Sequence, residues 1–237
     1  MTDRPEAATV GEIVATDPRA AAVFEQFGVD FCCGGSRSLT DACRTAAADP
    51  DAVVRALDAL PPPAGEDDVT QWPVERLIDH IINTHHGYVR SALPAITRYL
   101  AKLNDVHGAR HPELARVAAC FDGLRADFEQ HMMKEEQILF PYVRDIATRG
   151  EACGRAPSPF GTVENPIRMM EREHREAAEA MATIRKLTNG YKTPEDGCTT
   201  YAVCMDELDR FERDLHRHVH LENNVLFPKA VALEQGL

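Results

Sequence analysis

The stretch His131-Met-Met-Lys-Glu135-Glu-Gln-Ile-Leu-Phe-Pro141 occurs a second time, 87 residues later, as His218-Val-His-Leu-Glu222-Asn-Asn-Val-Leu-Phe-Pro228. Both copies read H-x-x-x-E-x-x-[IV]-L-F-P. On a helix, residues four apart differ by only about 40° in direction. Each copy therefore directs an imidazole and a carboxylate toward one point. Two such helices that face each other would offer two histidines and two glutamates to a shared metal site.

The apolar pattern around the two copies is helical. It predicts four long helices, over residues 73–106, 112–147, 165–190 and 199–233. Pro94 and Pro141 should kink the first two of them. Runs of β-branched residues with two-residue alternation are absent from the sequence, so no strand is expected. Modest connections between long helices predict an all-α fold, an antiparallel four-helix bundle.

A small helical domain is expected before the bundle. Helix-start signals stand at Thr9-Val-Gly-Glu12, Asp17-Pro18, Ser38 and Asp49-Pro50, and Gly28 is a stop signal for the second helix. A linker that begins at Pro61-Pro62-Pro63 separates this domain from the bundle. We therefore predict a small domain over residues 1–64 and the bundle over residues 65–237.

Composition narrows the range of functions. A net charge of −12 argues against binding to nucleic acid or to anionic membranes. No apolar run approaches the roughly 18 residues of a transmembrane helix, and the first residues lack a signal-peptide pattern. We therefore expect a cytoplasmic protein. Its seven cysteines have irregular spacing, which indicates free thiols rather than a disulfide framework.

The sequence predicts six metal ligands, one histidine on each long helix and a glutamate on the second and fourth. They are His86, His131, Glu135, His174, His218 and Glu222. Six ligands are too many for one tetrahedral zinc, and the histidines argue against magnesium or calcium. A single His-x-x-x-Glu pair would be read as a surface pair, but the duplication favours two metals bridged by both glutamates. Iron is the natural candidate, with manganese or zinc as substitutes.

Other polar residues near these positions need separate interpretations. The repeat selects His218 over His216 and His220, whereas spacing separates His86 from His85 less securely. Asp127 and Asp214 lie one turn before His131 and His218, so they are candidates to orient those rings or are simply solvated. Glu173 could line an access path, and the loop residues His107 and His111 are expected to be solvated.

Cys32 and Cys33 are adjacent and precede Gly34-Gly35. The glycines would allow positive φ angles and leave the thiols open to approach, and the helix that follows could lower a thiol pKa. The pair is a candidate redox or metal-handling site, with two buried thiols at a turn as the alternative. The other five cysteines are expected to serve packing or to have no role.

The chain resembles the repair-of-iron-centres family, the ScdA/YtfE-like di-iron proteins. The matching segments are Asp30-Phe-Cys-Cys-Gly-Gly35 for the family's small N-terminal domain, and residues 77–82 with His86, 131–141, 171–174 and 221–228 for its hemerythrin-like domain. The resemblance favours His86 over His85. It implies two non-haem irons, oxo- or hydroxo-bridged, in a protein that restores iron–sulfur clusters damaged by nitric oxide or oxidants.

Four histidines and two carboxylates would hold iron loosely and leave exchangeable positions, which suits an iron donor. Iron–sulfur proteins would be the recipients, and Cys32 and Cys33 would accept or relay iron or reduce the centre. The alternatives are an enzyme that reduces nitric oxide to nitrous oxide, and a carrier or sensor of oxygen or nitric oxide. Enzymatic activity, the electron donor, the recipients and a possible homodimer are left open by the sequence.

Overall fold

The computed structural model describes residues 8–60, 68–149 and 160–236. Their regular secondary structure is helical, with a single isolated bridge between Thr9 and Ser38, so the predicted all-α class is confirmed. The chain groups into two compact units. Unit 1 comprises Met1–Ile78, Val143–Val163 and His216–Leu237, and unit 2 comprises Asp79–Tyr142 and Glu164–Leu215.

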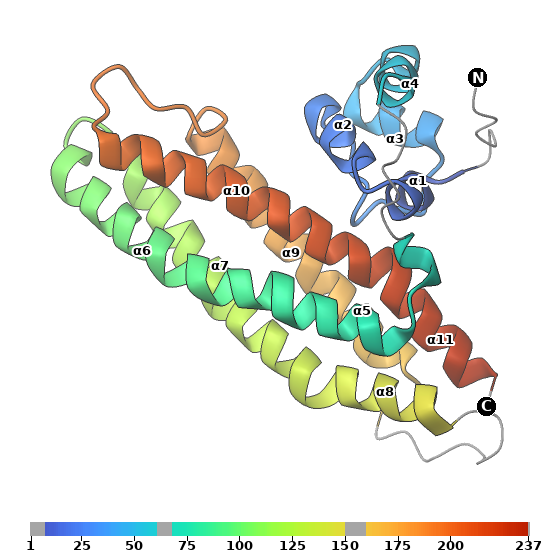
Figure 1. Ribbon diagram of the computed structural model, residues 1–237. Helices are drawn as coiled ribbons and strands as arrows, with labels where there is room; N and C mark the ends of the chain where they lie inside the picture. Colours follow the sequence, from blue (N-terminus) through green and yellow to red (C-terminus); the bar gives the residue numbers. More distant parts are fainter. Residues whose placement is uncertain (1–7, 61–67, 150–159, 237) are drawn as a thin grey trace. The chain divides into compact units, whose positions relative to one another are not determined.

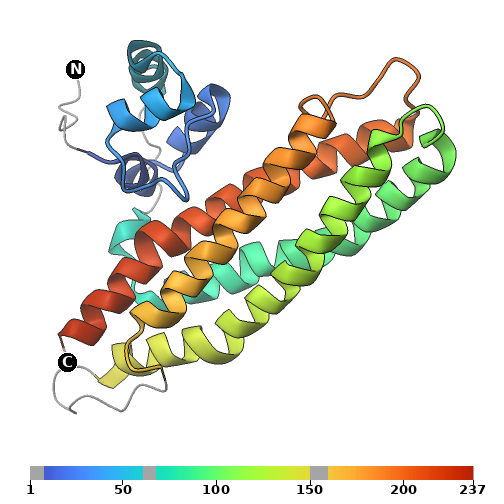
Figure 2. The same ribbon diagram turned by 180° about the vertical axis from the view of Figure 1, so that it is seen from behind.

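Unit 2 contains four long helices that lie side by side in both views (Figures 1 and 2). They are α6 (Gly87–His107), α7 (Glu113–Lys134), α9 (Glu164–Leu187) and residues 199–215 of α10 (Thr199–Leu221). Both hairpin connections lie at one end, where Asp196 contacts Arg110 and His111 at 3.0 Å each. Large apolar side chains such as Phe121 and Phe211 fill the interior, with their rings edge to face. This is the antiparallel arrangement that the apolar pattern predicts.

Three π-helical turns interrupt the predicted long helices. They are η2 (Ile81–His86) between α5 (Val74–His80) and α6, η3 (Glu135–Leu139) between α7 and α8 (Phe140–Arg149), and η4 (Glu222–Leu226) between α10 and α11 (Phe227–Gln235). The sequence predicts continuous helices kinked at proline instead. Pro141 and Pro228 are the second residues after η3 and η4, and they lack the N–H that a regular helix would donate to the preceding turn. Each π-turn begins or ends at a predicted ligand, and such turns are frequent at functional sites.

The first helices of unit 1 are short, and all of them except α2 begin at a side-chain cap. They are α1 (Val10–Thr16), α2 (Ala20–Phe27), α3 (Leu39–Ala46), α4 (Pro50–Asp58) and the 3₁₀ turn η1 (Val69–Gln71). The caps at Thr9, Ser38 and Asp49 are as predicted. The second helix begins at Ala20 rather than Pro18, because the Asp17 carboxylate accepts hydrogen bonds from the backbone and side chain of Arg19 and holds a turn there.

The predicted linker and domain boundary fall on residues 61–67, outside the described residues. So does most of the connection between the second and third predicted long helices. Within the described ranges, no helix combines the length and the apolar character that crossing a bilayer requires.

Candidate metal centre

Four of the six predicted ligands converge in the interior of unit 2. His86, His131, Glu135 and His174 are at most 1% exposed. The two oxygens of Glu135 face different histidines: Oε2 lies 3.4 Å from His86 Nε2, and Oε1 lies 3.2 Å from His131 Nε2. The Nε2 atom of His174 lies 2.9 Å from that of His131 and 4.0 Å from Glu135 Oε1. Glu135 therefore separates one imidazole from a close pair of imidazoles.

This donor set fits a metal ion. The ligand atoms of His131, Glu135 and His174 lie within 4.8 Å of one another. A fully buried carboxylate is costly unless a cation balances it. Imidazole nitrogens together with carboxylate oxygens suit iron and similar transition metals better than calcium or magnesium. The cluster has the composition of a non-haem iron site.

Two carboxylates accept hydrogen bonds from the outer ring nitrogens of His131 and His86, that is, from the Nδ1 atoms that point away from Glu135. His131 Nδ1 donates to Glu173 Oε2 at 2.9 Å, and His86 Nδ1 donates to Glu136 Oε1 at 2.6 Å. The hydrogen bond from His131 is the largest cause that lowers the pKa of Glu173 to about 2; burial opposes it, and Lys134 adds to it. Because Nδ1 carries the proton in the rings of His131 and His86, the lone pair on Nε2 of each ring is directed toward Glu135.

Asp127 and Asp214 were predicted either to orient the ligand histidines or to be solvated. The structure shows no orienting contact from Asp127, which is exposed, as the second alternative predicts. Glu173 takes the outer nitrogen of His131, while Asp127 lines a cavity beside that ring. Asp214 accepts a hydrogen bond from His85 Nδ1 at 2.9 Å. Sequence spacing along one helix suggested these aspartates, but the actual partner of His131 comes from a neighbouring helix. The hydrogen bond to Asp214 also explains the position of His85, whose ring is buried against that carboxylate. Its neighbour His86 faces Glu135 instead.

The remaining two predicted ligands lie in unit 1, one turn apart. His218 Nε2 lies 3.0 Å from Glu222 Oε1, and both side chains are 0% exposed. The other two histidines of this segment point elsewhere. His216 lies 3.7 Å from Glu25, and His220 Nδ1 lies 3.5 Å from the carbonyl oxygen of Phe31. Burial lowers the pKa of His220 to about 4, so this ring is neutral.

The Cys32–Cys33 turn is organised by Asp30. Its Oδ1 atom accepts hydrogen bonds from the backbone amides of Cys32 and Cys33 at 3.1 and 2.9 Å. Cys32 is buried and Cys33 is partly exposed, both as free thiols. The hydrogen bond with Cys33 and then burial raise the pKa of Cys32 well above its ordinary value. The expectation of a lowered pKa is therefore wrong for Cys32, and so is the expectation that both thiols are open.

Gly34 and Gly35 are not in the positive-φ region, contrary to the sequence-based expectation. Gly35 is needed because a Cβ there would lie 2.0 Å from Oδ1 of Asn224. The Asn224 amide donates to the carbonyl oxygens of Cys32 and Phe31 at 3.0 and 3.3 Å. The dithiol turn is thus docked, within unit 1, on the π-turn that begins at Glu222.

A cavity of about 270 Å³ reaches His131 between α7 and α9 of unit 2. Small residues such as Gly123 and Ala177 line it, and Asp127 and Glu173 supply its polar atoms. The cavity gives a small ligand or a metal ion a route to the ring of His131.

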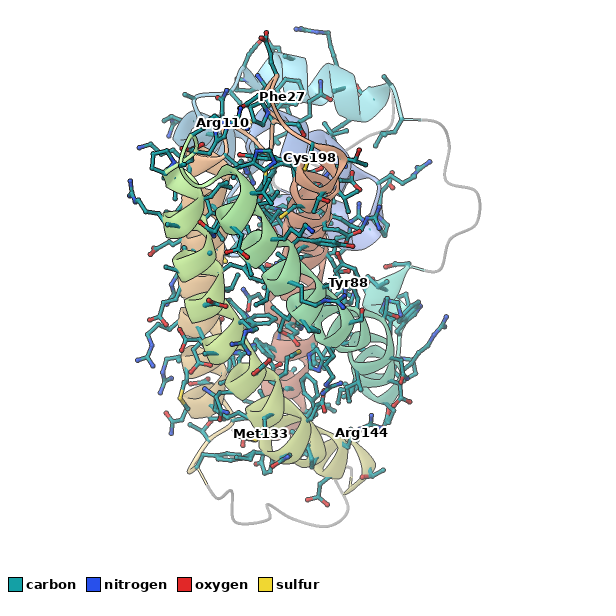
Figure 3. The ribbon with its side chains drawn as sticks, turned by 90° about the vertical axis from the view of Figure 1, so that its left-hand side faces the viewer. Phe27, Tyr88, Arg110, Met133, Arg144 and Cys198 are labelled. Carbon is teal, nitrogen blue, oxygen red and sulfur yellow. The ribbon has the colours of Figure 1, made fainter. Side chains whose placement is uncertain are left out.

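A second titratable cluster lies at the end of unit 2 that carries Arg110 and Cys198 (Figure 3). His107 was expected to be solvated but is 3% exposed, and its Nε2 lies 3.3 Å from Cys198 Sγ. His111 was also expected to be solvated, and it contacts Glu113 and Asp196 at 3.0 Å each. Contacts of His107 and His111 with the connection between α9 and α10, which local sequence does not show, explain both differences.

We expect Cys198 to be the most acidic thiol of this cluster. The hydrogen bond from His107, followed by the backbone amides at the start of α10, lowers its pKa to about 7. Alkylation by iodoacetamide, followed by peptide mass mapping, should therefore reach half its maximal rate near that pH and slow as pH falls. His107→Ala should move the midpoint upward. Cys120, whose pKa burial raises, serves as the internal control, and an unmoved Cys198 midpoint in His107→Ala would contradict the assignment.

Buried imidazoles and carboxylates on a helical bundle, together with a small capped helical domain, define a non-haem metal-binding protein of two parts. Comparison with models of protein families supports this class of protein. The model of the hemerythrin HHE cation binding domain matches residues 77–230, a range that includes all six predicted ligands. The model of the ScdA_N domain, a domain of unknown function (DUF542), matches residues 6–61.

Relatives match over nearly the full length. The iron-sulfur cluster repair protein YtfE of Dickeya chrysanthemi is 36% identical over 94% of this chain and 96% of the relative. The proteins of the same name from Cronobacter sakazakii and Escherichia coli (strain SMS-3-5) are 34% identical over 95% of this chain and 97% of their own. The chain belongs to the hemerythrin HHE cation-binding domain family and, within it, to the YtfE-like repair-of-iron-centres proteins.

Proposed function

We propose that the protein holds two non-haem irons between His86, His131, His174 and His218, bridged by Glu135 and Glu222. The observation that carries this proposal is the placement of Glu135, whose two oxygens face different histidines. A carboxylate in that position suits a bridge between two ions better than a ligand to one. The family match over residues 77–230 supports including His218 and Glu222 in the same centre.

We propose that this centre serves the repair of iron–sulfur clusters as an iron donor, consistent with the names of the relatives. When bound, the irons would supply exchangeable, redox-active metal to damaged iron–sulfur proteins. Only two carboxylates would offset the charge of two irons, fewer than the four of ferritin-like sites. Fewer anionic ligands favour Fe(II) and looser retention, which a donor requires.

The dithiol turn is the proposed exit site for iron. Asp30, Cys32 and Cys33 have ligand atoms within 4.8 Å of one another, a spacing at which they could share one ion. Cys33 is the partly exposed member, so it would meet an incoming ion first, and the docked Asn224 amide keeps the turn on the segment that carries Glu222. Soft sulfur ligands suit transient binding of iron, and the incoming ion would displace the proton of Cys32, because the pKa of this thiol is raised.

The test is iron transfer to an apo-ferredoxin that is supplied with inorganic sulfide. The Cys32→Ser/Cys33→Ser variant should load iron normally and reconstitute the cluster several-fold more slowly than the parent protein. Cys198→Ser, in the connection between α9 and α10, is the matched control and should transfer at the parent rate. Equal reconstitution by the double variant would remove the thiols from the mechanism, and failure of the parent protein to transfer iron would remove the donor function itself.

Reduction of nitric oxide is the second candidate function, favoured by the cavity that reaches His131. Gas analysis after addition of nitric oxide to the reduced protein, with a chemical reductant in excess to return electrons to the site, separates the two: nitrous oxide beyond one equivalent per site indicates an enzyme. Carriage or sensing of oxygen or nitric oxide stays a third prediction, which rapid irreversible oxidation in air would contradict. A cytoplasmic location and a homodimer also stay predictions.

A further inference from the structure

His86 is held at both ring nitrogens by two consecutive residues. Its Nε2 lies 3.4 Å from Glu135 Oε2, and its Nδ1 donates to Glu136 Oε1 at 2.6 Å. The ring also stacks on Phe140, with centroids 5.9 Å apart. Glu135 and Glu136 open the π-turn η3, so one turn of chain fixes the position, direction and tautomer of this imidazole.

Glu136 is in turn held from the surface. Its Oε1 atom also accepts a short hydrogen bond from Arg90, which lies one turn beyond His86 on α6. The side chains of Arg90 and Glu136 are 49% and 24% exposed, while that of His86 is 0% exposed. The partly exposed Arg90–Glu136 ion pair is therefore joined by a hydrogen bond to the fully buried imidazole of His86.

We infer that Glu136, braced by Arg90, is a positioning residue for His86 and sets how tightly the protein retains the iron on that side of Glu135. The inference rests on the proposed pair of irons. A histidine that donates its outer N–H to a carboxylate is a better-oriented and more basic ligand, and loss of such a carboxylate costs about 10–100-fold in metal affinity.

The effect should be confined to one side of the centre. His131 has its own carboxylate, Glu173, which is paired with Lys134 rather than with Arg90. His131 and His174 also face the other oxygen of Glu135. Removal of Glu136 leaves all of these contacts in place, so the iron near His131 should be retained as before.

The experiment measures iron release from the loaded, full-length protein to a colorimetric ferrous chelator under anaerobic conditions. In Glu136→Ala, one of the two irons should leave about 10–100-fold faster than in the parent protein, and the other at the parent rate. Glu136→Gln keeps an acceptor for His86 Nδ1 but not the charge, so its release should be intermediate. Arg90→Ala should likewise be intermediate.

Arg125→Ala is the matched control, since it breaks an exposed Arg–Glu pair on α7 that touches no predicted ligand. Its release should equal that of the parent. Unchanged release in Glu136→Ala, or equal acceleration of both irons, would overturn the inference. If Glu136→Ala does not fold, as judged by thermal unfolding of the metal-free form, Glu136→Gln and Arg90→Ala decide the question. A parent protein that binds no iron would instead refute the proposed centre.

Discussion

Glu135→Ala should empty the centre of both irons. Glu135 is 0% exposed, and its two oxygens face His86 on one side and His131 on the other. If it bridges two ions, each ion loses an anionic ligand at once, and each keeps mainly neutral imidazoles. Iron analysis after desalting should fall from two irons per chain to near zero, and the oxo-bridge absorption should disappear. A variant that retains both irons would refute the bridging role.

Two controls separate loss of a ligand from loss of the fold. Glu129→Ala removes an exposed carboxylate from the same helix and should keep both irons. Replacing a buried charged side chain by alanine removes the desolvation cost of the charge, which offsets part of the packing that is lost. The metal-free Glu135→Ala protein should therefore unfold at a temperature close to that of the metal-free parent. A large fall in that temperature would mean that the missing iron reports misfolding.

The internal repeat carries most of what the sequence predicts about the site. The i, i+4 spacing fixes which side chains share a helix face, so the repeat alone predicts the pairs His131–Glu135 and His218–Glu222. The same register separates His218 from His216 and His220, and the structure shows those two rings against Glu25 and Phe31. Helix starts at Thr9, Ser38 and Asp49 are predictable because a cap depends on neighbouring residues alone.

Contacts between helices could not be predicted in this way. Glu136 lies 50 residues from His86, and Glu173 lies 42 residues from His131. No local periodicity connects such partners, so spacing along one helix favoured Asp127 and Asp214 instead. The sequence did contain a signal for these partners, because each orienting carboxylate is next to a predicted ligand in the chain. Glu136 follows Glu135, and Glu173 precedes His174.

The two copies of the repeat differ where their tasks differ. Glu136 of the first copy orients His86, whereas the second copy has Asn223 at that place. Asn223 and the next residue, Asn224, donate to the carbonyl oxygen of Cys32 at 3.4 and 3.0 Å. The departure from the repeat therefore marks the segment that binds the dithiol turn, and the part that both copies share marks the proposed metal ligands.

Gly35→Ala should release the dithiol turn from this segment. The new Cβ would lie 2.0 Å from Asn224 Oδ1 and 2.5 Å from its Cγ, so the amide must move away. The two hydrogen bonds from Asn224 to Cys32 and Phe31 would be lost. At a net 0.5–1.5 kcal/mol each, the free energy of unfolding should fall by about 1–3 kcal/mol. Buried Cys32 should also be alkylated faster.

A double-mutant cycle tests whether Asn224 is the cause. Asn224→Ala loses the same hydrogen bonds but also removes the obstacle, so adding Gly35→Ala to it should cost little more. Gly123→Ala is the matched glycine control: nothing lies within 4 Å of its Cβ position in α7, and alanine there should be neutral or stabilising by up to about 1 kcal/mol. Denaturant unfolding gives the energies, and iodoacetamide labelling gives the exposure of Cys32. Additive losses in the double variant would show that Gly35 is required for some reason other than the Asn224 amide.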